Sequence, residues 1–143
     1  MVMYQEKTQR EDTRTTNKVH RFVENDDLTS LLDEYKRDPV GVQQCFHQTN
    51  EEGYTPGDLA VMNENLEMTY AMWTMESFAP KSKYGDGFVE SVHPDNQKTC
   101  KQYVYRGISE CAPISGKIEG ISQAWTLKEE DNSLASIGKG RKL

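Results

Sequence analysis

The sequence predicts an α+β fold, in which two short N-terminal helices and one long central helix pack on a small antiparallel sheet of about three to four strands. Two observations favour this class. Up to residue 80, apolar residues recur at spacings of three and four, as on one face of a helix. After residue 87, short runs rich in β-branched and aromatic residues lie between turn residues, which is typical of strands.

Two short helices are expected before the long one. Asn25, Asp26 and Asp27 are possible N-caps for a helix over residues 27–37, where apolar residues recur at i, i+3, i+4 and i+7. Asp38 can close that helix and cap the next, because Pro39 suits the first helical position. The second helix should end before Gly53. Each of these helices has a single apolar face.

The long helix is predicted over residues 55–80. Thr55 is a suitable N-cap, Pro56 fits the first position, and Asp58 stands where the acid of a capping box reaches back. Pro80 should end the helix.

Helical spacing gives this long helix two apolar stripes on nearly opposite sides. The first stripe contains Leu59, Met62, Leu66, Tyr70 and Trp73, and the second contains Val61, Met68, Met72, Met75 and Ala79. Both must be covered, because exposed apolar surface is unfavourable in water. We expect the sheet to cover the first stripe, and the short helices or a partner protein to cover the second.

Three strands are predicted in the second half of the chain, over residues 88–93, 99–106 and 117–127. Residues 107–116 contain several helix breakers and are expected to form a loop. In the third strand, a bulge at Gly120 would let the apolar residues before and after it face the same side of the sheet. No internal repeat is evident in the sequence.

The expected organisation is a single domain between two polar arms. Residues 1–18 contain few large apolar side chains and are predicted to form a flexible arm. Residues 19–127 would form the α+β domain. Residues 128–143 show no sustained period and end in a basic run, so they are predicted to form a flexible tail.

Charge is distributed unevenly along the chain, whose net charge is −6. Residues 24–80 hold twelve acids and two bases, while the segments on either side each have a net charge of +2. The acidic middle argues against nucleic acid as a partner. No window has the length and hydrophobicity of a membrane span, and the N-terminus lacks the apolar core of a signal peptide. We therefore expect a cytoplasmic protein without membrane insertion.

No catalytic motif is recognisable, so the sequence predicts a protein that is not an enzyme and needs no cofactor. The three cysteines lack the paired spacing of a zinc site, and reduced thiols are expected. Pairing of two of them, Cys100 and Cys111, stays possible in an oxidising compartment. No metal is predicted, although a mixed site is geometrically conceivable from Cys45, His47, His93, Cys100 and Cys111.

Two hypotheses for function follow. The first is a non-enzymatic protein–protein interaction module, a small subunit or accessory factor of a larger assembly, which binds a protein partner or another copy through Val61, Met68, Met72, Met75 and Ala79. The second is a small-ligand-binding domain with a pocket between helix and sheet, lined by Met62, Leu66, Tyr70, Trp73, Tyr103, Tyr105 and Trp125.

Overall fold

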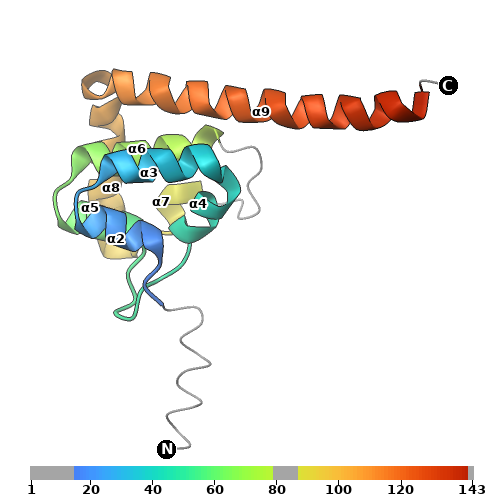
Figure 1. Ribbon diagram of the computed structural model, residues 1–143. Helices are drawn as coiled ribbons and strands as arrows, with labels where there is room; N and C mark the ends of the chain where they lie inside the picture. Colours follow the sequence, from blue (N-terminus) through green and yellow to red (C-terminus); the bar gives the residue numbers. More distant parts are fainter. Residues whose placement is uncertain (1–14, 79–86, 142–143) are drawn as a thin grey trace, which may run out of the picture.

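The computed structural model describes residues 15–78 and 87–141, with side chains up to residue 128, and these residues form helices and no strand. The α+β prediction is therefore wrong, and the fold is all-helical (Figure 1). The helices are α2 (Lys18–Glu24), α3 (Leu28–Arg37), α4 (Pro39–Phe46), α5 (Pro56–Met62), α6 (Leu66–Phe78), α7 (Gly87–Glu90), α8 (Pro94–Glu110) and α9 (Ala112–Arg141).

The two short helices predicted before the long one are confirmed as α3 and α4, and Asp27 is the candidate that caps α3. The Asp27 carboxylate accepts a hydrogen bond from the Ser30 amide at 3.1 Å. Asp38 in turn accepts from the Gly41 amide at 3.1 Å, and Pro39 occupies the first position of α4. Local cap chemistry was sufficient to place both helices.

The predicted helix over residues 55–80 is two helices in the structure. Its N-terminus is confirmed, because Thr55 and Asp58 form a complete capping box at the start of α5. The chain then turns at Glu64, whose φ of 55° is left-handed. Asn65 caps α6 by accepting from the Met68 amide at 3.1 Å. Asn65, which falls inside the single helix predicted from the sequence, is thus the N-cap of a second helix.

The three predicted strands are wrong because their residues lie in helices. Helix α7 takes up residues 88–90 of the first predicted strand, and the rest of that strand is the turn before α8. Residues 99–106 lie inside α8, and residues 117–127 lie inside α9. The predicted loop over residues 107–116 is helical except at Cys111, where α8 ends. The buried residues of α8 and of its C-cap recur at helical spacing, at Cys100, Val104, Gly107 and Cys111.

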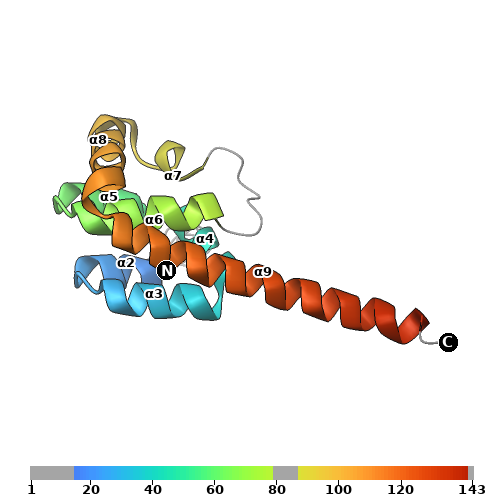
Figure 2. The ribbon, with the colours of Figure 1, turned by 90° about the horizontal axis from the view of Figure 1, so that it is seen from above.

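Helix α9 lies across the body and then continues beyond it (Figures 1 and 2). Its first half packs against α6 and α3, and the Tyr35 hydroxyl lies 2.5 Å from that of Ser122. With 30 residues it is about 45 Å long at 1.5 Å per residue. The helix includes residues 128–141 of the predicted tail. Most of the predicted N-terminal arm falls outside the described residues, but Lys18 already belongs to α2.

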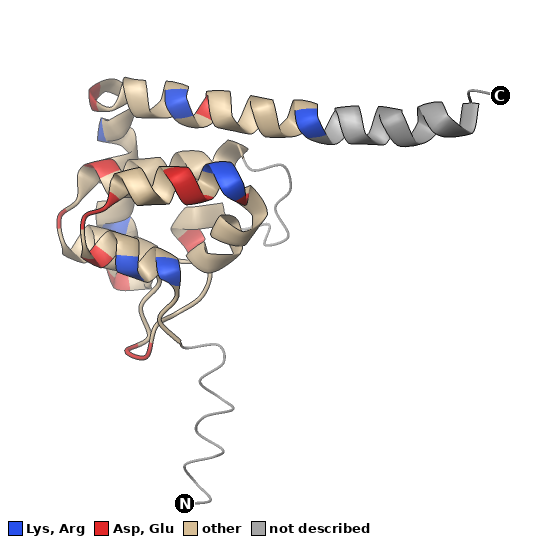
Figure 3. Ribbon diagram, in the orientation of Figure 1, with Lys and Arg blue, Asp and Glu red and all other residues tan. Residues whose placement is uncertain are grey.

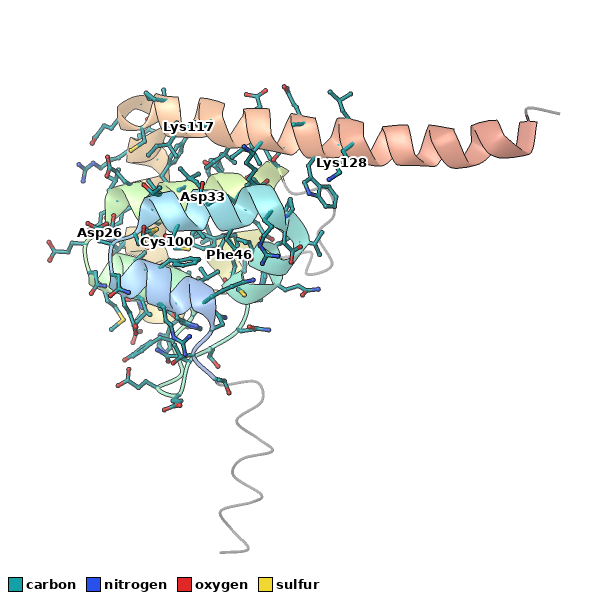
Figure 4. The ribbon with its side chains drawn as sticks, viewed as in Figure 1. Asp26, Asp33, Phe46, Cys100, Lys117 and Lys128 are labelled. Atoms are coloured by element: carbon teal, nitrogen blue, oxygen red, sulfur yellow. The ribbon has the colours of Figure 1, made fainter. Side chains whose placement is uncertain are left out.

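Helix α6 is the centre of the core, and the chain itself covers it on both sides. It contacts α4, α5, α7, α8 and α9. Met68, Met72 and Met75 are fully buried within these contacts. Phe46 and Cys100, which also lie inside the helical body, are labelled in Figure 4. Flexible methionine side chains suit such an irregular space between helices that cross in several directions.

The N-caps reveal an internal repeat. Asn17, Thr55 and His93 are the N-caps of α2, α5 and α8, and each stands 38 residues after the previous one. We call the pairs α2–α3, α5–α6 and α8–α9 the three helix-pair units. The first helices of adjacent units are in contact, α2 with α5 and α5 with α8. The first helices therefore lie in a row, but α9 of the third unit also contacts α3 of the first, so the units close into one body and do not form the open stack of a solenoid.

The first two units share the same turn between their helices. Asp26 and Glu64, 38 residues apart, both have a left-handed φ, 52° and 55°. The amide of Asp27 donates to the Phe22 carbonyl, and that of Asn65 donates to the Ala60 carbonyl, both at 2.8 Å. The side chain of Asn65 also donates to Asp26 at 2.8 Å, which joins the two equivalent turns. The third unit departs from this pattern, because α8 has 17 residues where α2 and α5 have seven.

Candidate protein-interaction site

In the first two units, a polar side chain near the start of the first helix forms hydrogen bonds to the next unit. The Nε2–H of His20 donates to the Tyr54 carbonyl at 2.9 Å, just before the second unit. The equivalent residue, Asp58, accepts from the His93 amide at 2.9 Å and from the Asn96 side chain at 2.7 Å, at the start of the third unit. These buried links fix the spacing of the units, and so the shape of any surface formed by them together.

His20 should make the stability of the fold depend on pH. Its Nδ1 accepts from the Asn17 amide at 3.0 Å, so Nε2 carries the proton of the neutral ring. Burial lowers the pKa of His20 below its ordinary 6.5, despite the opposing effects of the Tyr54 carbonyl and Glu24. The unfolded chain therefore binds a proton first as the pH falls.

The stabilisation from neutral His20 should be complete above pH 6.5 and be lost as the pH falls from there through the lower pKa of the folded state. Urea unfolding at pH values on both sides of 6.5 measures this loss. The His20→Gln variant, which cannot titrate, should be less stable at neutral pH but show a flatter dependence. An equally steep dependence in that variant would assign the effect to other groups.

The loop between α4 and α5 is a rigid acidic projection. Within it, the side chain of Asn50 accepts from the amides of Glu52 and Tyr54, both at 2.9 Å. The Asn50 amide donates to the Tyr54 carbonyl at 2.7 Å, which closes the loop. Glu51 and Glu52 are exposed at its tip, away from the helical body (Figure 3).

The outer face of α8 carries the most exposed large apolar side chain among the described residues. Tyr105 is 78% exposed and Ile108 is 54% exposed. Tyr105 also lines an open depression of about 390 Å³, together with Lys101, Gln102, Tyr103 and Arg106. Exposed tyrosine and arginine next to an aliphatic side chain are the residue types that protein interfaces favour. We call the exposed set Lys101, Gln102, Tyr105, Arg106 and Ile108 the α8 face.

The residues predicted to form a partner-binding stripe lie in the core. Met68, Met72 and Met75 have no exposed surface, and Val61 is 6% exposed. Ala79 falls outside the described residues. A partner could reach the described members of this stripe only if the helical body opened.

The residues predicted for a ligand pocket are dispersed. Tyr70 is 3% exposed and packs on Trp73 with ring centroids 5.8 Å apart, whereas Met62 is 47% exposed. Leu66 and Trp125 are half-buried. Tyr103 and Tyr105 are brought together at the α8 depression. The sheet that was expected to form one wall of the pocket is absent from the described residues.

The cysteines are buried free thiols in the structure. Burial raises the pKa of all three, that of Cys100 to about 12, so they are protonated and weakly nucleophilic at neutral pH. The described residues contain no group of three or more histidine, cysteine or acidic side chains placed to hold a metal ion.

One buried polar cluster lies between α4 and α6. His47 Nε2 is 3.3 Å from a carboxylate oxygen of Glu76. The other oxygen of Glu76 and the Nε2 of Gln43 are buried without a hydrogen-bond partner. Each of these atoms is costly to bury without a hydrogen-bond partner.

Sequence reasoning identified Tyr105 only as part of a pocket and did not select Ile108. The missing signal was the helical period of residues 100–111, which places Tyr105 away from the buried face and Ile108, three residues later, at its edge. The repeat was missed because the units differ in sequence. Over the 21 positions from residue 17, only three residues recur 38 positions later.

No helix in the part of the chain that the structure describes has both the length and the apolar character that a bilayer span requires. The chain was compared with models of protein families, with curated proteins and with solved structures, and none of them matches it.

Proposed function

We propose that this protein is a non-enzymatic protein–protein interaction module, a small subunit or accessory factor of a larger assembly. Its helix-pair units fix the shape of a surface that binds the partner. The 38-residue recurrence of the N-caps carries the proposal. Helix pairs that recur and pack on one another, as these do through α2, α5 and α8, can hold an exposed helix face in a fixed shape for a partner.

The α8 face is the surface that we assign to the partner. Helix α8 extends beyond the length of the equivalent helices, and its additional turns carry Tyr105 and Ile108. The Arg106 guanidinium is exposed beside them and lies 3.1 Å from Glu110. A partner that fits this face would bring an apolar centre with a polar, partly acidic rim.

The test compares the wild-type chain with a Tyr105→Ala/Ile108→Asp double variant as immobilised bait in an extract of the source cells. We expect the wild type to retain a specific protein, and the double variant to lose at least about tenfold in affinity for that protein when it is purified. Isothermal titration measures the second step.

The matched control is Asp33→Ala/Thr29→Ala, which changes two exposed residues of α3 on another part of the body. This control should bind as the wild type does. Circular dichroism establishes that all three proteins are folded. A partner retained equally by the Tyr105→Ala/Ile108→Asp variant would remove the α8 face from the proposal, and retention of no protein by any of them would contradict the interaction module itself.

A further inference from the structure

Helix α8 ends the row of first helices, and no described element covers its outer side. Helix α2 contacts α5, and α5 contacts α8, so each helix of the row packs on the next. Figure 2 shows α2, α5 and α8 following one another across the body, with α8 at one edge. The α8 face is exposed on the side away from this row. It is therefore placed where a further helix would pack.

The α8 face carries positive charge that its own acids do not compensate. Arg106 pairs with Glu110 at 3.1 Å. Lys101 is exposed, and so is Lys98, which lies three residues earlier on the same side of the helix. Among the described side chains, neither lysine has a carboxylate within ion-pair distance. Two positive charges are thus available to carboxylates of a partner.

Tyr105 gives this charged surface an apolar centre. It is 78% exposed and borders the depression of about 390 Å³. Tyr103 and the long side chains of Lys101 and Arg106 line the same depression. Lysine and arginine present aliphatic stems to such a hollow while their charged ends stay in water. The depression therefore suits an apolar side chain that has acidic groups close beside it.

The segment that carries these groups should be a helix. The described residues contain no strand edge to which an extended segment could add. Side chains spaced by three and four residues along α8 form ridges, such as the line of Lys98, Lys101 and Tyr105. The ridges of a second helix fit between them.

We propose that the α8 face binds a helix of another protein, one that presents an apolar side chain with carboxylates one helical turn away. The inference rests on the proposed function and specifies the class of partner. The apolar side chain enters the depression beside Tyr105, and the carboxylates pair with Lys98 and Lys101. On the partner, residues three or four apart share one face, so a single helix can supply both kinds of group.

Two other occupants fit less well. A nucleic acid would extend past the face, where the net charge of −6 and the exposed Asp95 and Glu110 at the two ends of α8 repel its phosphates. A second copy that met the face about a two-fold axis would bring lysines against lysines. A short acidic helix avoids both kinds of repulsion.

Selection from a random library of peptides about 16 residues long, enough for four helical turns, tests the class of partner. Peptides are enriched on the wild-type chain and depleted of those that also bind the Tyr105→Ala/Ile108→Asp variant. We expect the survivors to share an apolar residue with Asp or Glu three or four positions away, and to become helical on binding, as circular dichroism measures. Survivors without acidic residues, survivors that stay non-helical, or no survivors would overturn the inference.

A charge exchange tests the role of the two lysines. The Lys98→Glu/Lys101→Glu variant should bind the tightest selected peptide at least about tenfold more weakly, as fluorescence anisotropy measures. Replacement of the acids of the peptide by lysine should restore binding to this variant. The matched control Arg21→Glu/Lys36→Glu makes the same change of charge at exposed residues of α2 and α3 and should bind as the wild type does. Equal weakening in the control, or no restoration, would overturn the proposed pairing.

The other occupants are measured with the same charge-reversed variant. Single-stranded DNA of about 15 nucleotides that bound the wild type and not the variant would assign the face to nucleic acid. A dimer of the wild type that the variant abolished in sedimentation would assign it to a second copy. Either result would overturn the inference and leave the α8 face a binding surface. Retention of no protein from the source cells would contradict the interaction module even where a selected peptide binds, so the two proposals can fail separately.

Discussion

The Asp58→Ala substitution should lower the free energy of unfolding by about 3 kcal/mol or more, because it leaves several buried donors without an acceptor. Asp58 is 1% exposed. One carboxylate oxygen accepts from the amide and hydroxyl of Thr55, and the other accepts from the His93 amide and the Asn96 side chain. The substitution therefore removes the Asp58 half of the capping box of α5 and the link of α5 to α8. Urea unfolding followed by circular dichroism measures the change.

Two further variants distinguish the loss of the hydrogen bonds of Asp58 from the loss of its negative charge. Asp58→Asn keeps one acceptor oxygen and should cost less than Asp58→Ala. Asp33→Ala removes an exposed carboxylate from α3 and should change stability by about 0.5 kcal/mol or less. If Asp58→Ala were as mild as Asp33→Ala, the polar link between the second and third units would not stabilise the fold.

Gly107→Ala should destabilise the fold by about 1–3 kcal/mol, although alanine is the better helix former. A Cβ atom at Gly107 would lie 2.4 Å from the ring of Tyr70 and 2.7 Å from its Cβ. Tyr70 is only 3% exposed and packs on Trp73, so its ring has little room to move away. Thermal and urea unfolding both report this effect.

Gly120→Ala is the matched control, since it makes the same change in a helix where a Cβ atom meets nothing within 4 Å. Measured in dilute protein, this variant should be unchanged or more stable by up to about 1 kcal/mol. Opposite signs for the two glycines would confirm that close approach of α8 to α6, and not helix propensity, selects glycine at position 107. Destabilisation by both substitutions would contradict that explanation.

Local signals near the N-terminus predicted the helices well. Asp38 and Thr55 are caps whose chemistry acts within three or four residues, so the sequence was enough to place them, and it narrowed the cap of α3 to Asn25, Asp26 or Asp27. The same kind of signal was available at Asn65 and His93 but was given less weight than apolar stripes and β-branched runs. His93 precedes Pro94, and this pair starts α8 as Thr55 and Pro56 start α5.

The strand predictions failed because β propensity is weak evidence beside packing. Residues 99–106 contain a tyrosine, a valine and another tyrosine, but Cys100, Val104 and Gly107 make one buried helical face against α6. Gly116 was expected in a loop and Gly120 at a bulge of the third strand, but both lie within α9. Both are tolerated there because they lie on the outer side, and Ile118 between them packs in the core.

The residues of the candidate site could be recognised only after the strands predicted in the second half of the chain were replaced by helices α8 and α9. A stripe with several methionines is typical of an adaptable surface or of an irregular core, and the sequence left both possibilities open. Only the course of α8 and α9 over α6 shows that Met68, Met72 and Met75 are core residues. The α8 face became recognisable once residues 94–110 were known to form one helix with Tyr105 and Ile108 on its exposed side.

By itself, the sequence determined the caps of α4 and α5 and the start of α3 to within three residues, because a cap is a contact between neighbours in the chain. Tertiary structure alone decided the class of fold, the cover of α6 and the packing of the three units. Those features depend on contacts between residues far apart, such as Asp58 with His93 and Tyr35 with Ser122. The burial free energy gained in such contacts exceeds the small differences in local propensity that favoured strands.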